Sequence, residues 1–388
     1  MKLFYLLTLS SFCLNDPLCE PPYLKYKEIN DSDLIQVHLI SRHGARVSLH
    51  KPKNIPSNWT CHNKNIHAYN KNKSNLLNVH VSSGKSIFVG NCFAGQLVDS
   101  GNQGLTRLGK YIRSIYIEKL KFLPRRFKQS VLLFRTTSTH RTINSQMSFI
   151  EGLYPDHPDV IMNIADSTFD NWRNPASICP RLAKILAITK SNVNFTKEDI
   201  EVMEKASKLL GSTWRFNLDA TVPAFCERNK LPRMIDRDYI LKIQRIKAKE
   251  TQVASSNESL FPLLFGYSMA EILNHMLNRI SGNSSLRFIH WSAHDGNLNS
   301  ALGYLGYIDE VWPTFGSYML IELWKNHLSN SFYIVFRFNG KIIASKRFGN
   351  KYYVPFDEYY KFVKSHIPDL YKDCKFKFNK FIKNTFYS

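Results

Sequence analysis

Three short apolar runs, each followed at once by a polar loop, constrain most strongly what this chain can fold into. The runs cover residues 34–40, 130–134 and 286–292, and such short stretches of apolar, partly β-branched residues fit buried strands of a parallel sheet better than helices. Helical patterns follow the second and third runs, so the sequence predicts an α/β fold. In an open α/β sheet, ligands bind at the loops that leave the carboxyl ends of the strands, which makes these three loops the candidates for chemistry.

The first loop carries two arginines and a histidine around one glycine, in the hexapeptide Ser41-Arg42-His43-Gly44-Ala45-Arg46. Arg42 and Arg46 offer forked, permanently charged donors that suit phosphate oxygens. His43 lies between them and is a candidate nucleophile or base. The alternative is a basic loop on a basic protein, so the motif needs partners elsewhere in the chain.

The second loop runs from Arg135 to Thr142 and contains two arginines. Arg135 is the candidate phosphate-binding residue because it directly leaves the strand, whereas Arg141 is expected to support the structure. His140 in the same loop and His290 in the third strand are expected to be structural histidines.

The third loop holds the pair His294-Asp295. Such a pair standing alone is more often part of a helix cap, and both Asp295 and Asn297 are suitable caps for the helix that follows. Directly after a strand, and in a chain with two other polar strand-end loops, the pair is more consistent with a catalytic role.

The remaining sequence predicts a core that is interrupted by an insertion. Residues 156–260 contain helical patches and no strand run of comparable quality, which predicts a mainly helical cap inserted between core segments 32–155 and 261–388. Residues 51–86 are rich in Asn, Lys, His and Ser, as expected of a long exposed loop. Further strands with a tight Asn-Gly hairpin are expected beyond residue 318.

The charge of the chain favours anionic partners. The 388 residues include 52 Lys and Arg against 31 Asp and Glu, which gives a net charge of +21. Phosphorylated or sulfated molecules, nucleic acids and acidic membranes would all be attracted to such a protein. The sequence contains no zinc-finger spacing, no aromatic RNA-binding signature and no repeat, so a nucleic acid partner is not expected.

The first residues resemble a secretory signal. A positive start is followed by about a dozen mostly apolar residues, which is short for a membrane span, so residues 1–18 are expected to be a signal peptide or a short signal anchor. Glycosylation in the secretory pathway is compatible with six sequons, at Asn30, Asn58, Asn72, Asn194, Asn257 and Asn283.

The cysteines favour disulfides over a metal site. Cys13 lies in the apparent signal, which leaves an even set of six, and no C-x-x-C or Cys/His cluster has the spacing of a metal site. Six cysteines allow fifteen pairings, and the sequence alone does not select one. The candidates for disulfides are Cys61, Cys92, Cys179 and Cys226, and the last two could pin the helical insertion.

The three loops together resemble the histidine acid phosphatases, whose motifs occur in the same order: Arg42-His43-Gly44-Ala45-Arg46, then Arg135 to Thr142, then His294-Asp295. The resemblance extends from about residue 34 to residue 348. It implies a phosphoglycerate mutase-like mixed or parallel sheet flanked by helices. Within that family, the chain most resembles the 2-phosphoxylose phosphatase branch. This weaker similarity lies in residues 112–116, 123–124, 292–295 and 321–324.

The resemblance also implies a mechanism without a metal or other cofactor. His43 would attack phosphorus and form a phosphohistidine, and Asp295 would protonate the leaving oxygen. The phosphate-binding residues would be Arg42, Arg46, Arg135 and His294, because positioning and charge neutralisation are most of what phosphoryl transfer requires. One departure is Ser48, where members of the family commonly have proline.

Three functions remain open from the sequence. The first is a phosphomonoesterase of the secretory pathway, in the Golgi lumen, secreted or lysosomal, which acts on a phosphorylated sugar such as 2-phosphoxylose or on a broad set of phosphomonoesters. The second is a scaffold that binds a polyanion such as a glycosaminoglycan, and a homodimer is compatible with either. The third, a phosphomutase, is disfavoured by the secretory start and the large insertion.

Overall fold

The computed structural model describes residues 16–55, 58–61, 66–68, 77–79, 89–156, 159–165, 170–173, 175–307 and 311–374. One mixed sheet forms the centre, with the strand order β11-β10-β9-β1-β8-β6-β7 and with β12 paired to β10. Strands β1, β8, β6 and β7 are parallel, whereas β9 to β12 form an antiparallel extension. The strands of this sheet are β1 (Ser32–Arg42), β6 (Leu132–Thr136), β7 (Met162–Ile164), β8 (Phe288–Ala293), β9 (Tyr318–Asn326), β10 (Phe332–Phe338), β11 (Lys341–Ile343) and β12 (Tyr353–Pro355).

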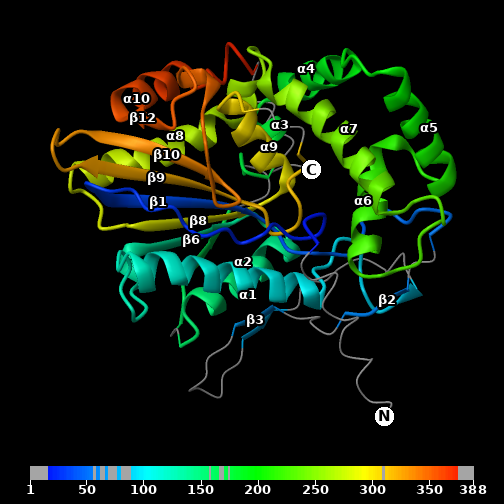
Figure 1. The fold of residues 1–388 in the computed structure, drawn as a ribbon, viewed down its shortest axis with the longest axis horizontal. Helices are drawn as coiled ribbons and strands as arrows, with labels where there is room; N and C mark the ends of the chain where they lie inside the picture. Colours follow the sequence, from blue (N-terminus) through cyan, green and yellow to red (C-terminus); the bar gives the residue numbers. More distant parts are fainter. Residues whose placement is uncertain are drawn as a thin grey trace, which may run out of the picture.

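Helices cover both faces of the sheet (Figure 1). Helices α1 and α2 pack on one face, and α8, α9 and α10 pack on the other. The alternation of side chains along β1 divides it between the two layers, because Val37 and Leu39 join the first core and Ile40 joins the second. The helices of these layers are α1 (Asp99–Arg113), α2 (His140–Leu153), α8 (Phe261–Ile280), α9 (Asp295–Tyr304) and α10 (Phe356–Ser365).

The expected fold class is therefore confirmed: the chain forms a mixed sheet flanked by helices. The three predicted strands correspond to β1, β6 and β8, and the Asn-Gly hairpin joins β10 to β11. Helix α1 begins at Asp99 and is followed directly by a π-helical turn over Ser114–Lys119. The residue before α9 is His294, so neither Asp295 nor Asn297 is the N-cap; the Asn297 side chain instead accepts from the His294 backbone N–H.

A second group of helices lies beside the sheet, at the right of Figure 1. It includes α6, which the sequence did not indicate, and its interior contains a separate apolar cluster. Strand β7 also falls within residues 156–260, which were expected to lack strands. The division into core and cap stays a prediction. The helices of this group are α3 (Pro175–Ile178), α4 (Pro180–Ser191), α5 (Lys197–Leu210), α6 (Trp214–Cys226) and α7 (Arg237–Ser256).

Three disulfides join distant parts of the chain: Cys19–Cys226, Cys61–Cys92 and Cys179–Cys374. Cys179 and Cys226, expected to pin the helical insertion, are both in disulfides, but they are not bonded to each other. Each of these two cysteines instead ties the helical group to a segment near one end of the chain. The pairing depends on long-range contacts, which spacing along the sequence does not reveal.

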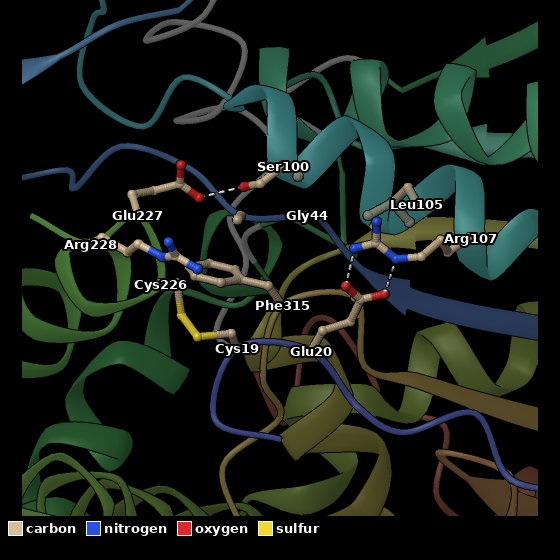
Figure 2. Close-up of a pocket in the computed structure, with 14 residues that line it drawn as sticks. Cys19, Glu20, Gly44, Ser100, Leu105, Arg107, Cys226, Glu227, Arg228 and Phe315 are labelled. Atoms are coloured by element: carbon tan, nitrogen blue, oxygen red, sulfur yellow. Dashed lines mark hydrogen bonds and ion pairs between the residues drawn. A yellow bond between two sulfur atoms is a disulfide. The ribbon is translucent and has the colours of Figure 1, made fainter. Parts of the chain in front are cut away.

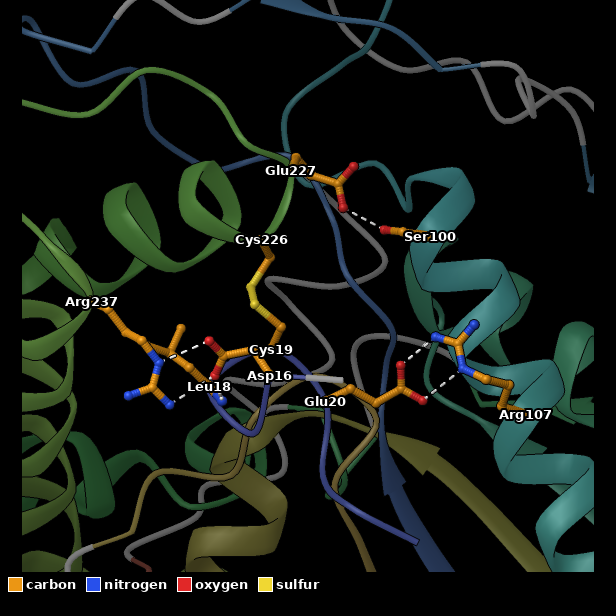
Figure 3. Close-up of a disulfide and its surroundings, with 9 residues drawn as sticks. All are labelled: Asp16, Leu18, Cys19, Glu20, Ser100, Arg107, Cys226, Glu227 and Arg237. Atoms are coloured by element: carbon orange, nitrogen blue, oxygen red, sulfur yellow. Dashed lines mark hydrogen bonds and ion pairs between the residues drawn. A yellow bond between two sulfur atoms is a disulfide. The ribbon is translucent and has the colours of Figure 1, made fainter. Parts of the chain in front are cut away.

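The segment Asp16–Glu20 fastens the helical group to the sheet domain (Figure 3). Asp16 forms an ion pair with Arg237 at 2.9 Å, Cys19 forms the disulfide to α6, and Glu20 forms a two-point ion pair with Arg107 of α1. Most of the expected signal, residues 1–15, lies outside the described residues. In the part of the chain that is described, no helix is long and apolar enough to cross a membrane.

The expected exposed loop of residues 51–86 lies largely outside the described residues. The parts that are described near it form two small strand pairs, β2 with β5 and β3 with β4. Their bounds are β2 (Asn58–Trp59), β3 (Ile66–Ala68), β4 (Leu77–Val79) and β5 (Val89–Gly90). The Cys61–Cys92 disulfide ties the two ends of this region together.

Candidate active site

The three polar loops meet at one edge of the sheet because the strands that precede them are parallel neighbours. Arg42 at the end of β1 lies beside Ala293 of β8, and Thr136 at the end of β6 lies beside Ser292. The His43 N–H donates to the carbonyl of Ala293 at 3.0 Å. The backbone of the sheet therefore fixes the loops relative to one another.

His43 is almost fully buried, at 2% exposure, and is held in one orientation. Its Nδ1 lies 2.9 Å from the Gly44 carbonyl oxygen. Because a carbonyl oxygen only accepts, Nδ1 carries the hydrogen, and the neutral ring has its lone pair on Nε2. Burial lowers the pKa of His43 well below its usual value, and the cations Arg141, Arg42 and Arg46 lower it further. The ring is thus kept neutral, as a nucleophilic imidazole must be.

The side chain of Arg42 connects the first loop to the third. Its Nη2 forms an ion pair with Asp295 at 2.8 Å, its Nη1 donates to the Pro313 carbonyl at 2.7 Å, and its guanidinium lies 4.3 Å from the centre of the Phe315 ring. Burial lowers the pKa of Arg42 to about 10, so the group remains a cation at physiological pH.

Arg46 is held by a residue that the sequence did not indicate, Asp219 of α6. Arg46 Nη1 and Asp219 Oδ1 are 2.6 Å apart, and the other carboxylate oxygen accepts from the N–H groups of Leu49 and His50 at 2.8 and 3.2 Å. Asp219 thus fixes both the arginine and the backbone that follows it. No local pattern marks this residue, because its role depends on where α6 packs.

Arg141 lies closer to the reacting groups than Arg135. Arg141 Nη2 donates to His294 Nδ1 at 3.5 Å, and Arg141 is the first of the cations that lower the pKa of His43. Arg135 instead forms an ion pair with Asp170 at 2.5 Å. The geometry therefore favours Arg141 as the third arginine of the site, in place of the expected Arg135.

The direction of each side chain explains the difference. Arg135 lies inside β6, where its guanidinium is 5.6 Å from the Trp172 ring and 5.9 Å from the Trp291 ring, in the layer of the sheet that contains α8. Arg141 lies in the first turn of α2, beyond the end of the strand. A residue at the strand end is not always the one that faces the site, because successive side chains point to opposite faces.

Three of the arginines carry unused donors. Within the described part of the chain, the Nε atoms of Arg42, Arg46 and Arg141 are buried and have no hydrogen-bond partner, and Arg135 has no such atom. Buried donors are almost always satisfied in proteins, and an oxyanion would satisfy these. The set is thus suited to bind a phosphate group.

His294 and Asp295 complete the cluster. His294 Nε2 lies 3.0 Å from the Thr137 hydroxyl, and burial lowers the pKa of His294 to about 3, so its ring is neutral. Burial raises the pKa of Asp295, but the opposing effects of Arg42, Arg46, His294 and the Gly296 N–H are larger together, and its pKa is lowered overall. The side chain of Asp295 remains 28% exposed and can reach a ligand from the solvent side.

A cavity of about 800 Å³ opens over this cluster, lined by Arg42, Arg46 and Asp295 on one side and by residues of α4, α6 and α7 on the other. Within the described ranges, no group of acidic, histidine and cysteine side chains could hold a metal ion. His140 and His290, expected to be structural, contact Asn144 and Ser41 respectively.

A smaller cavity of about 210 Å³ lies behind the candidate catalytic loop, residues 41–46 (Figure 2). Gly44 and Phe315 line it together with the Cys19–Cys226 disulfide, and the Glu20–Arg107 and Ser100–Glu227 contacts flank it. Gly44 packs directly on α1 here: a Cβ on it would lie 2.3 Å from the Gly101 carbonyl oxygen. The glycine of the hexapeptide is therefore required by this close approach.

Comparisons with known proteins agree with the geometry. A family model of the histidine phosphatase superfamily (branch 2) matches residues 33–258, which is more than half of the chain. Counting factor 60 of Dictyostelium discoideum is 25% identical over 339 residues, which are 79% of this chain and 80% of that protein. Human 2-phosphoxylose phosphatase 1 is 24% identical, over 76% of this chain and 67% of its own length. The rat protein of that name is 25% identical, but the match spans only 52% of its length.

Solved structures share the fold. The phytase of Citrobacter braakii superposes with a TM-score of 0.63 over 88% of this chain and 99% of its own, at 11% identity. The multiple inositol polyphosphate phosphatase of Bifidobacterium longum superposes with a TM-score of 0.57 over 92% and 98% of the two chains, at 8% identity. The chain belongs to branch 2 of the histidine phosphatase superfamily and is a histidine acid phosphatase, a phosphoric monoester hydrolase.

Proposed function

We propose that the protein hydrolyses phosphate monoesters without a metal, through a phosphohistidine at His43. The observation that carries this proposal is the Nδ1 contact to the Gly44 carbonyl, which leaves the lone pair on Nε2 of a ring that is kept neutral. Three arginines with unused Nε donors surround this ring, and they suit the phosphate that the ring would attack.

The residues divide the reaction between them. His43 Nε2 bonds to phosphorus as the bond to the leaving oxygen breaks, and Asp295 gives its proton to that oxygen. Water then attacks phosphorus and loses a proton to Asp295, while the bond from phosphorus to His43 Nε2 breaks and inorganic phosphate is released. Arg42, Arg46 and Arg141 neutralise the charge on the phosphoryl oxygens, with His294 beside them, and this is the main requirement of phosphoryl transfer.

Asp295 and the buried arginines favour an acidic working range. Asp295 must be protonated when the leaving group departs, and its pKa in the free protein is lowered by Arg42 and Arg46 after the opposing effect of burial. The phosphate dianion of a bound substrate opposes that lowering, because a nearby negative charge favours the protonated carboxyl. His43 stays neutral at acidic pH, so the nucleophile and the acid are both in their active forms there.

The proposed physiological substrate is a 2-phosphoxylose of a proteoglycan linkage region, with glycosaminoglycan contacts. Support comes from the 2-phosphoxylose phosphatases among the relatives, each about a quarter identical or less. The disulfides are typical of proteins of the secretory pathway. We propose that the protein acts in a compartment of the secretory pathway: the Golgi lumen, the outside of the cell or the lysosome. A broad-specificity acid phosphatase is the second candidate, favoured by an acid phosphatase relative that is 25% identical.

The decisive measurement is phosphate release from an aryl phosphate by the purified protein, beside His43→Ala. We expect the variant to lose activity by several orders of magnitude, and the wild type to yield a phosphoenzyme that is labile to acid and stable to base. Equal turnover by both proteins would reject His43 as the nucleophile. Hydrolysis of a 2-phosphoxylosyl glycoside, compared with the aryl phosphate, separates the two substrate candidates, and binding of heparin without any turnover would instead favour a polyanion-binding scaffold.

A further inference from the structure

The large cavity above the catalytic cluster has room for more than a phosphate group. Its volume is about 800 Å³, and its far wall is built by α4, α6 and α7. These helices lie together at the side of the sheet in Figure 1. If the phosphate of a substrate occupies the arginine cluster, its leaving group must occupy the space along this wall. The chemistry of the wall therefore decides which leaving groups fit.

Among the described residues, the acidic side chains that line the cavity are all paired within it. Asp295 is paired with Arg42 at 2.8 Å, and Asp219 is paired with Arg46 at 2.6 Å. The third, Glu250 of α7, accepts from Lys247 at 2.9 Å. Glu250 also accepts from the Trp214 indole at 3.3 Å. Three carboxylates thus neutralise three of the five cations of the lining.

Two cations of the lining remain without an acidic partner. Lys190 lies in the last turn of α4 and Arg215 in the first turn of α6. Among the described residues, neither forms an ion pair or a side-chain hydrogen bond, and the guanidinium of Arg215 only lies near the Phe216 ring, at 5.4 Å. Both are close enough to Lys247 to lower its pKa, although burial has the larger effect. The wall therefore carries a local excess of positive charge.

Apart from Thr251, the rest of the described wall is apolar. Leu186 of α4, Leu218 and Val222 of α6, and the rings of Trp214 and Trp312 also line the cavity. Such a surface suits the carbon body of a leaving group, and isolated unpaired cations within it suit an anion carried by that body. A neutral hydrophilic leaving group would use neither feature.

We propose that Lys190 and Arg215 form a subsite for a second anionic group, so that the preferred substrates are phosphomonoesters whose leaving group carries a carboxylate, sulfate or further phosphate. The proposal rests on the proposed phosphatase function, because it assigns the leaving-group side of the same cavity. It names residues from two helices that the three sequence motifs do not include. The two cations select the substrate and take no part in the bond-breaking step.

The test compares matched substrates that differ only in charge. Phosphate esters of ω-hydroxycarboxylic acids of increasing chain length are hydrolysed beside the corresponding primary amides, and kcat/KM is measured from phosphate release. We expect the wild type to prefer the carboxylate at one range of chain lengths, by about two- to fivefold for each cation engaged. Higher ionic strength should reduce the preference, because the subsite is partly open to solvent.

The variants isolate the two cations. Lys190→Gln/Arg215→Gln should remove the preference for the carboxylate and leave kcat/KM for the amides unchanged. Lys184→Gln/Arg233→Gln is the matched control, since it removes one exposed lysine and one exposed arginine that do not line the cavity. Lys190→Glu/Arg215→Glu should turn the preference toward ω-aminoalkyl phosphates, a gain that damage to the fold cannot produce.

The outcomes separate the two proposals. If the wild type hydrolyses carboxylates and amides equally at every chain length, or if the preference persists in Lys190→Gln/Arg215→Gln, the subsite is rejected and the phosphatase function stands. If the wild type releases phosphate from none of the esters, nor from an aryl phosphate, the proposed function itself is rejected. If the preference for the carboxylate falls as much in the Lys184→Gln/Arg233→Gln control as in Lys190→Gln/Arg215→Gln, it depends only on the net charge of the protein, and the subsite is also rejected.

Discussion

At the scale of single residues, the environment of His43 converts an ordinary imidazole into a candidate nucleophile. The Gly44 carbonyl fixes the hydrogen on Nδ1, while burial and three arginines disfavour a second proton. The same arginines are the groups that would bind the phosphate. In the proposed mechanism, a single cluster of charges would therefore perform two tasks: it would attract the substrate and keep the attacking nitrogen free of a proton.

The lowered pKa of His43 can be measured directly. We expect the ¹⁵N signals of its ring, assigned by their loss in His43→Ala, to report the neutral form protonated on Nδ1 at acidic pH values where an ordinary histidine, with a pKa of about 6.5, is already a cation. The pKa of His43 is lowered because burial and the charges of Arg141, Arg42 and Arg46 all disfavour the cationic ring. A midpoint near the ordinary value, or a proton on Nε2 in the neutral form, would contradict the proposed state of the nucleophile.

Asp219 is expected to act through Arg46 and not on the substrate itself. In Asp219→Asn, the charge opposite Arg46 is lost, and we expect KM for an aryl phosphate and the inhibition constant of inorganic phosphate to rise about tenfold, as is usual for a charged hydrogen bond. kcat should fall much less. Asp219→Glu keeps the charge and should restore part of the affinity. If the inhibition constant of inorganic phosphate is unchanged in Asp219→Asn, Asp219 does not support phosphate binding.

At the scale of elements, the catalytic loop and the helices of one layer are packed through glycines. The backbone of Ala45 lies against α1, where a Cβ on Gly101 would be 2.2 Å from the Ala45 carbonyl oxygen. Further along the same helix, a Cβ on Gly109 would be 2.2 Å from the Phe149 carbonyl oxygen of α2. The first contact positions the site, whereas the second only holds two helices together.

Two alanine substitutions in α1 should therefore have different effects. Gly101→Ala should destabilise the fold and lower kcat/KM, because the catalytic loop must shift. Gly109→Ala should cost about 1–3 kcal/mol of stability by overpacking and leave the activity of the folded protein near normal. Melting temperatures measure the loss of stability in both variants, and kcat/KM measured below the unfolding transition shows which of them also loses activity. Gly296→Ala is the stability control, since among the described residues nothing beyond its chain neighbours and its own helix backbone lies within 4 Å of its added Cβ; equal melting temperatures for all three variants would contradict the packing argument.

At the scale of the whole molecule, two of the disulfides join the helical group to the two ends of the described chain. Cys19–Cys226 attaches the segment after Asp16 to the end of α6, the helix that carries Asp219 (Figure 3). Cys179–Cys374 attaches the start of α4 to the end of the described chain. The position of Asp219 against the catalytic loop thus depends on covalent links between segments that are far apart in sequence.

Removing the Cys19–Cys226 or the Cys61–Cys92 disulfide should lower the free energy of unfolding by different amounts. Cys19 and Cys226 are 207 residues apart and Cys61 and Cys92 are 31 apart, so loop entropy predicts that Cys19→Ala/Cys226→Ala loses about 1.7 kcal/mol more stability than Cys61→Ala/Cys92→Ala. Reversible unfolding in guanidinium chloride measures both. A larger loss for the shorter loop would show that contacts around Cys61, and not loop closure, dominate the stability of the molecule.

The sequence by itself determined the parts of this protein that depend on local patterns. The apolar runs predicted the three parallel strands, and the polar residues that follow them predicted that Arg42, His43, Arg46, His294 and Asp295 lie together. This inference works because parallel strands place their carboxyl ends at one edge of the sheet. Local helical patterns also predicted most helices of the second group, whereas the mixed sheet was implied by the resemblance to the histidine acid phosphatases.

Only the tertiary structure decided which residues complete the site. The choice between Arg135 and Arg141 depends on the direction of side chains at the end of β6, and the role of Asp219 depends on how α6 packs on the first loop. The disulfide partners of Cys179 and Cys226 lie about 200 residues away, at separations of 195 and 207. Such contacts arise from the packing of distant segments, and the local pattern of residues carries no record of them.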